Sequence, residues 1–86
     1  MMNVCVLGLG YIGLPTALVL ANADHKVFGV DININVINKL NAGEITINEK
    51  NIQNLFENVI CKNNFRFGLS PIISDIYIIA VPTPLK

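Results

Sequence analysis

The glycines of residues 8–13 constrain the fold of this chain more than any other feature, because they stand between an apolar run and a helix-like segment. Val4–Leu7 is continuously apolar and partly β-branched, as in a buried parallel strand. Gly8, Gly10 and Gly13 then form the pattern G-x-G-x-x-G. The first glycine permits a tight turn, the second lets the backbone approach a pyrophosphate, and the third lets a helix pack closely on the strand. The pattern predicts a strand, a phosphate-binding turn and a helix.

The segment after the glycines is compatible with a helix over Tyr11–Ala23. Pro15 is tolerated there because it lies in the first turn, where the N–H groups lack intrahelical partners. The N–H groups around Tyr11 and Ile12 open this helix, and the helix dipole favours an anion in front of them. We therefore expect phosphates to bind at Tyr11 and Ile12.

An acidic residue follows the second predicted strand, Lys26–Val30. Asp31 lies eighteen residues after Gly13, near the usual position of a carboxylate that binds the adenosine ribose. It would repel a 2′-phosphate, and no Lys or Arg stands at residues 32–35, so NAD is favoured over NADP. The alternative is a glycine-rich turn of another α/β protein, in which Asp31 is only a cap close to a helix.

The rest of the chain continues to alternate helices and strands. Asn33 caps a short helix that Gly43 ends. A third helix is predicted further along the chain, because apolar residues recur at i, i+3, i+4, i+7 and i+8. They are Ile52, Leu55, Phe56, Val59 and Ile60. Strands follow at Phe65–Leu69 and Ile76–Val81. The alternation predicts an α/β fold: the N-terminal half of a Rossmann-type parallel sheet with three α/β/α layers.

The link between the last two strands is unusually short. Only residues 70–75 connect them, and six extended residues span at most about 20 Å, whereas a parallel crossover usually takes a dozen residues or more. We therefore expect the third strand to be short and at an edge, with an irregular connection behind it.

A strand order of 3-2-1-4 would open a crevice at the carboxyl ends of the first and fourth strands. The loop after the fourth strand contains Thr83 between two prolines, and its hydroxyl can donate to a phosphate or to the nicotinamide side of the dinucleotide. The alternative is a proline-bracketed turn with a solvated threonine.

Composition limits the class of protein. The chain has 86 residues, and we expect them to form one domain, 1–86. Its 52% hydrophobic and 14% charged residues exclude intrinsic disorder. Zero net charge with six Lys and Arg counts against nucleic-acid binding. Cys5 and Cys61 are too far apart for a redox pair and have no histidine cluster for a metal, so we expect reduced thiols in a cytoplasmic protein.

The apolar stretch of residues 4–23 has a second interpretation, as a secretory signal or a membrane span. No Lys or Arg precedes it, and three glycines and Pro15 interrupt it. Its first part also serves as the opening strand of the α/β alternation. We therefore expect neither export nor membrane insertion.

Four motifs in order give the chain a family resemblance that covers essentially its whole length. Together they resemble the amino-terminal domain of the UDP-glucose/GDP-mannose dehydrogenase family, and most of all its UDP-N-acetyl-D-mannosamine branch. The motifs are VLGLGYIGLPTA at 6–17, GVDI at 29–32, LNAGE at 40–44 and IAVPTP at 79–84.

The resemblance implies NAD contacts at Tyr11, Ile12, Asp31 and Thr83. It implies an oxidoreductase of polysaccharide biosynthesis that oxidises the C6 alcohol of a UDP-sugar to a carboxylate in two NAD-dependent steps, and a homodimer when full-length. The family's catalytic cysteine lies far downstream, and neither Cys5 nor Cys61 matches it. We therefore expect an NAD-binding fragment without the central helix and the sugar-binding domain, inactive by itself.

Three alternatives remain. The chain can be the corresponding fragment of a UDP-glucose 6-dehydrogenase, a free-standing nucleotide-binding module without catalysis, or the remnant of a decayed gene.

Overall fold

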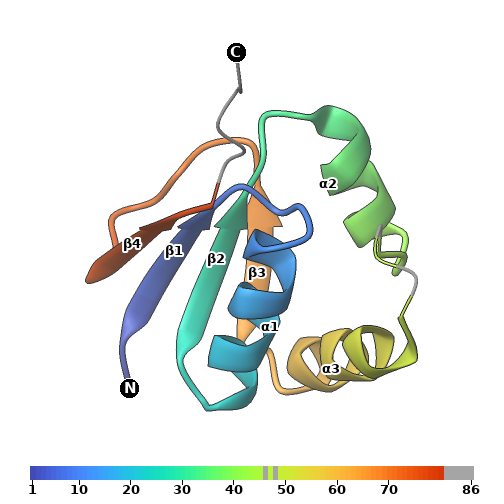
Figure 1. Cartoon of the computed structure of the whole chain (residues 1–86). Coiled ribbons are helices and arrows are strands. Elements are labelled where there is room, and N and C mark those ends of the chain that lie inside the picture. Colours follow the sequence, from blue (N-terminus) through green and yellow to red (C-terminus); the bar gives the residue numbers. More distant parts are fainter. Residues whose placement is uncertain (46, 48, 81–86) are drawn as a thin grey trace.

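The chain forms a parallel four-stranded sheet with three helices in a computed structural model that describes residues 1–45, 47 and 49–80 (Figure 1). The strands stand in the order β3-β2-β1-β4, as expected, and every neighbouring pair is parallel. Along the chain the elements are β1 (Asn3–Leu7), α1 (Gly13–Asn22), β2 (Lys26–Val30), α2 (Ile34–Asn41), α3 (Lys50–Cys61), β3 (Phe65–Gly68) and β4 (Ile76–Ile79).

The predicted elements are present with small shifts at their ends. Helix α1 begins at Gly13 rather than Tyr11, and Ile12 is its N-cap residue. Strand β3 ends at Gly68, one residue before the expected end. The expected end of β4, Val81, lies outside the described residues.

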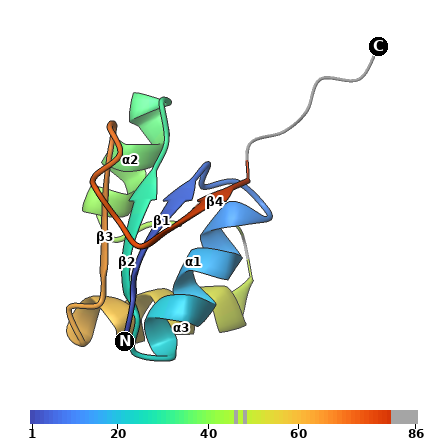
Figure 2. The same ribbon diagram turned by 90° about the vertical axis from the view of Figure 1, so that its left-hand side faces the viewer.

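Alternation along the strands divides the sheet into two faces. Val4 and Val6 of β1 point into the main core, where they meet the buried side of α1, formed by Leu14, Ala17, Leu18 and Ala21. Buried side chains of α2 and α3 join the same cluster, so all three helices contribute to one core. Figure 2 shows α1 on one side of the sheet and the link between β3 and β4 on the other. The described residues thus supply two of the three expected layers.

The apolar faces of α2 and α3 are only partly buried. Phe56 and Val59 of α3 are buried, and Ile52 and Leu55 pack partly against the core. Ile60, expected on the same face, is 42% exposed. It lies in an open groove between α3 and α2 whose lining includes Leu40 and Phe67.

All three helices end in the same hydrogen-bonded motif. The first residue beyond the C-cap has a positive φ in each case: Asp24 (72°), Gly43 (80°) and Asn63 (59°). The next residue donates its N–H to a carbonyl five residues earlier, as in the bond from Asn64 to Val59. This is a Schellman arrangement, which satisfies carbonyls that a helix end leaves free.

The short connection of residues 69–75 is irregular, as expected, and a side chain holds it in shape. The Tyr77 hydroxyl donates to the Ile72 carbonyl and accepts the Ser74 N–H, at 3.1 and 3.0 Å. The Asn3 N–H donates to the Asp75 carboxylate at 2.9 Å, which fastens the end of the connection to β1. The connection therefore crosses the sheet without a helix of its own.

Asn64 is the buried polar residue that joins α1, β2 and α3. Its Nδ2 donates to the Ala21 carbonyl at 3.0 Å, its Oδ1 accepts from Lys26 Nζ at 3.1 Å, and its carbonyl accepts the Val27 N–H. The side chain is 7% exposed, so water cannot easily replace these partners.

We predict that Asn64→Ala lowers the free energy of unfolding by about 1–3 kcal/mol, since it removes two side-chain hydrogen bonds, one of them from the charged Lys26 ammonium. Urea denaturation followed by circular dichroism measures this. The control is Asn58→Ala, which removes an exposed bond to Asn22 and should cost less than about 0.5 kcal/mol. Equal losses for the two variants would contradict the assignment.

The ion pair between Lys62 and Asp24 gives a second prediction. Lys62 Nζ lies 2.7 Å from Asp24 Oδ1, and this hydrogen bond, with the attraction between the charges, lowers the pKa of Asp24 below 3.8. The contribution to stability is therefore present above the pKa of the unfolded chain and is lost as the pH falls through the lowered value. An NMR titration of the Asp24 side-chain carboxyl carbon should give a midpoint below the ordinary pKa of aspartate. The Lys62→Met variant should have a higher midpoint. An unchanged midpoint in the variant would exclude Lys62 as the cause.

Candidate functional site

A cavity lies over the carboxyl ends of the strands, where the sequence predicts the dinucleotide. Its volume is about 570 Å³. The glycine turn, the end of β2, the start of α2 and the link between β3 and β4 all contribute to it. Its lining residues are Leu7, Gly8, Leu9, Gly10, Val30, Asp31, Ile32, Asn33, Val36, Leu69, Pro71 and Ala80.

The turn after β1 has the geometry that its glycines predict. Gly8 has φ 105°, which favours glycine. A Cβ on Gly13 would overlap the carbonyl of Gly8, so α1 starts in direct contact with the turn. A Cβ on Gly10 would meet no atom within 4 Å, because Gly10 faces the open cavity. The turn thus combines a tight inner side with a free outer side.

The outer side of the turn is exposed to solvent. Tyr11 is 82% exposed and Ile12 71%, although both are large and apolar. Thr16, one turn into α1, donates its hydroxyl to the Ile12 carbonyl at 2.8 Å. No side chain caps the start of α1, and the Leu14 N–H donates to the Gly10 carbonyl. The N–H groups before Leu14 therefore face the side from which an anion can approach a helix start.

Asp31 points its carboxylate toward the glycine turn. Oδ2 accepts the Leu9 N–H at 3.0 Å, and Oδ1 accepts the Asn33 N–H at 2.9 Å. Among the described residues that line the cavity, Asp31 is the charged one, and none is Lys or Arg. The electrostatic environment therefore suits ribose hydroxyls and disfavours an additional phosphate.

The structure brings six of the seven candidate residues to one end of the sheet. They are Gly8, Gly10, Tyr11, Ile12, Gly13 and Asp31, on the turn after β1, the start of α1 and the end of β2. Thr83, the seventh, lies outside the described residues. Leu69 and Pro71 also line the cavity. Sequence reasoning missed them because nothing in the irregular 69–75 segment indicates where it crosses the sheet.

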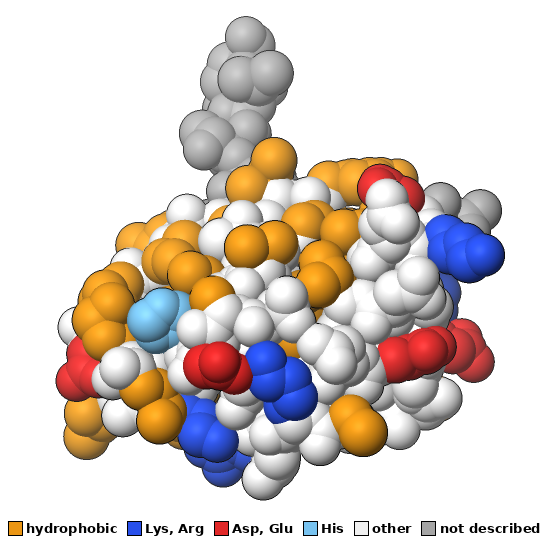
Figure 3. All heavy atoms as spheres, turned by 90° about the horizontal axis from the view of Figure 1, so that it is seen from below, with side chains coloured by type: hydrophobic (Ala, Val, Ile, Leu, Met, Phe, Trp, Pro, Cys, Tyr) orange, Lys and Arg blue, Asp and Glu red, His pale blue; other side chains and the backbone are white. Residues whose placement is uncertain are grey.

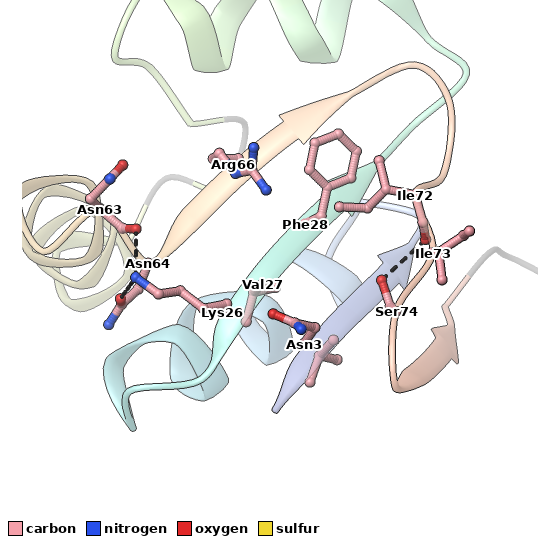
Figure 4. A pocket seen from close by; sticks show the side chains of 11 residues that line it. Asn3, Lys26, Val27, Phe28, Asn63, Asn64, Arg66, Ile72, Ile73 and Ser74 are labelled. Carbon is pink, nitrogen blue, oxygen red and sulfur yellow. Dashed lines mark hydrogen bonds between the residues drawn. The ribbon is translucent and has the colours of Figure 1, made fainter. Parts of the chain in front are cut away.

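A second hollow, of about 270 Å³, lies on the sheet face opposite α1 (Figure 4). Its two cations are already engaged. Lys26 Nζ donates to the Asn63 carbonyl and to Asn64 Oδ1, at 3.4 and 3.1 Å, and the Arg66 guanidinium lies 5.7 Å from the centre of the Phe28 ring. Both cations therefore stabilise the fold through contacts within the protein, and we assign this hollow no ligand.

The end of the molecule opposite the cavity has no single dominant charge on its visible face. Acidic and basic side chains alternate there with apolar ones (Figure 3). This agrees with the zero net charge of the chain. Within the described residues, no helix is both long enough and apolar enough to cross a membrane.

Comparison with known proteins decides the family. The model of the UDP-glucose/GDP-mannose dehydrogenase family, NAD binding domain, matches residues 2–86. The chain belongs to this family. The resemblance seen in the four motifs is confirmed, and so are the Rossmann-like fold and the NAD cofactor.

Relatives within the family agree with the branch that the motifs indicate. The UDP-N-acetyl-D-mannosamine dehydrogenase of Campylobacter jejuni is 47% identical over 84 residues, which are 98% of this chain and 21% of the relative. The UDP-N-acetyl-mannosamine dehydrogenase structure from Staphylococcus aureus has a TM-score of 0.92 and 45% identity, over 95% of this chain and 20% of that one. A UDP-D-ManNAc dehydrogenase structure from Pyrococcus horikoshii has a TM-score of 0.90 and 37% identity, over 99% of this chain and 21% of that one. The chain thus spans about a fifth of the length of these relatives.

The second and third glycines of the turn give a testable contrast. We predict that Gly13→Ala lowers the free energy of unfolding by about 3 kcal/mol or more, because its Cβ would overlap the Gly8 backbone. Gly10→Ala should change it by less than about 0.5 kcal/mol, because its Cβ enters open space. Denaturant unfolding of both variants measures the difference. A Gly13→Ala chain as stable as the native one would disprove the close contact.

Proposed function

We propose that this chain is the NAD-binding part of a UDP-N-acetyl-D-mannosamine 6-dehydrogenase. The enzyme oxidises the C6 alcohol of the UDP-sugar to a carboxylate in two steps, each of which reduces one NAD. When bound, NAD supplies the acceptor for the hydride that leaves C6. The observation that carries the proposal is the cavity over the glycine turn, bounded by the Asp31 carboxylate, in a member of this family.

In this proposal the residues of the turn hold the pyrophosphate. Gly8 and Gly13 shape the turn, and Gly10 leaves the space that a phosphate needs next to the backbone. The N–H groups around Tyr11 and Ile12 donate to phosphate oxygens. Thr83, after β4, donates to a phosphate or to the nicotinamide side. The position of Thr83 in the sequence and the family resemblance support this role.

Asp31 binds the hydroxyls of the adenosine ribose. Each carboxylate oxygen accepts one backbone N–H and retains a lone pair for a ribose hydroxyl. A 2′-phosphate would face this negative charge in a cavity whose described lining has no Lys or Arg. The site therefore selects NAD over NADP.

The wider setting of the enzyme is also part of the proposal. Residues 1–86 form its NAD-binding domain and supply the cofactor site, whereas the groups that react with the sugar come from outside these residues. Buried Cys5 and exposed Cys61 are free thiols, which suits a cytoplasmic protein. As the resemblance implies, the full-length enzyme is a homodimer that serves polysaccharide biosynthesis.

We expect the 86-residue chain to bind NAD and to bind NADP at least about tenfold more weakly, since the 2′-phosphate lies near the Asp31 charge. Isothermal titration calorimetry measures both. With UDP-N-acetyl-D-mannosamine added, the same samples should form no NADH. Equal affinity for the two cofactors, or turnover by these residues alone, would be incompatible with the proposal.

The matched variant for this experiment is Gly10→Ala. Its Cβ meets no protein atom, so the fold remains, but it occupies the space proposed for the pyrophosphate. The NAD affinity of this variant should be at least about tenfold lower than that of the native chain. Its midpoint of denaturant unfolding should equal that of the native chain. An unchanged NAD affinity would show that the pyrophosphate does not bind at the glycine turn.

A further inference from the structure

The inner half of the glycine turn is fastened to the end of β2 by two consecutive N–H groups. Gly8 donates to the Val30 carbonyl at 2.7 Å, which extends the backbone pairing of β1 with β2. Leu9 donates to Asp31 Oδ2 at 3.0 Å, so its acceptor is a side chain. The position of Leu9 therefore depends on the identity of residue 31.

The Asp31 carboxylate is itself held in place. Its second oxygen accepts the Asn33 N–H at 2.9 Å, two residues further along the chain. Rotation of the carboxylate would break one of the two bonds. The group therefore forms a bridge between the start of α2 and the glycine turn.

Leu9 is fixed both through its N–H group and through its side chain, whereas the residues that follow it are exposed. Its side chain is fully buried, and a Cβ added to Gly29 of β2 would lie 2.8 Å from it. Gly10 and Tyr11, which follow, are exposed. The bond to Asp31 thus fixes the turn directly before the exposed segment that would meet the phosphates.

We propose that Asp31 is a positioning residue for the phosphate-binding turn, in addition to its role as a ribose ligand. Through the Leu9 amide it holds the turn in the shape that receives a pyrophosphate. This inference rests on the proposed function. The two roles differ in a measurable way, because positioning acts on every ligand with a pyrophosphate, whereas ribose binding acts only on ligands with ribose hydroxyls.

The experiment compares ADP with 2′,3′-dideoxy-ADP, which keeps the diphosphate and lacks both hydroxyls, in the native chain and in Asp31→Asn. In the native carboxylate each oxygen accepts one of the two N–H groups. An asparagine in the same position has an NH₂ group in place of one of these oxygens, so the bridge between the turn and the start of α2 is broken. We expect Asp31→Asn to bind 2′,3′-dideoxy-ADP about fivefold more weakly, the effect of one hydrogen bond. Removal of a negative charge near the diphosphate would by itself strengthen binding, so electrostatics cannot produce this loss.

The matched control is Asp75→Asn. Asp75 also accepts a strand N–H through its carboxylate, from Asn3, but it lies at the amino end of the sheet and does not line the cavity. Its substitution should leave the affinity for 2′,3′-dideoxy-ADP unchanged. If Asp31→Asn also leaves that affinity unchanged, Asp31 is a ribose ligand only and the inference is wrong.

Amide hydrogen exchange tests the same bond without a ligand. In the native chain the Leu9 N–H should exchange slowly, and in Asp31→Asn faster, while the Gly8 N–H, bonded to Val30, keeps its native rate. If Asp31→Asn does not fold, the native chain still decides: a Leu9 amide that exchanges as fast as in an unstructured peptide overturns the inference.

The failure of the inference is distinguishable from that of the proposed function. A native chain that binds neither NAD nor ADP overturns both. A native chain that binds NAD, together with an Asp31→Asn chain weakened only toward ligands with ribose hydroxyls, overturns the positioning role alone.

Discussion

The close contact of Gly13 with Gly8 sets where α1 lies on the sheet, and both the core and the cofactor site depend on that position. Because Gly13 has no side chain, α1 starts directly against the turn that leaves β1. This places Leu14 and Leu18 over Val4 and Val6. It also brings the first N–H groups of α1 to the carboxyl end of the sheet, where an anion can reach them. The absence of a side chain at Gly13 thus affects both the packing of the core and the geometry of the cofactor site.

The site is assembled from three separate pieces of chain, and hydrogen bonds of backbone and side-chain groups hold them in place. The turn is tied to β2 through Gly8 and Leu9, and β2 is tied to β3 through the bond from the Asp31 N–H to the Gly68 carbonyl. The connection after β3 then brings Leu69 and Pro71 to the same cavity. A cavity built in this way is shaped before a ligand arrives, which lowers the ordering cost of binding.

The sequence predicted features that depend on residues close together in the chain. The turn of residues 8–13, the second strand and the end of α2 at Gly43 follow from local chemistry, and each was found where it was expected. The positive-φ residues beyond the other two helix ends were not foreseen. They use Asp24 and Asn63 at positive φ, and such residues also occur in many places where φ is negative. The strand order was also correct, although the short link between the third and fourth strands has to cross from one edge of the sheet to the other.

Contacts between distant segments came only from the tertiary structure. Asn64 reads as one more asparagine in a sequence rich in them, yet it joins α1, β2 and α3 beneath the core. The bond from Leu9 to Asp31 connects residues that are twenty-two apart. Sequence alone determined the fold class, the glycine turn and the acidic residue, because these follow from periodicity and from the needs of a tight turn. Folding decided which groups meet across the sheet, because a hydrogen bond between distant residues depends on strand register and helix placement, which no local pattern encodes.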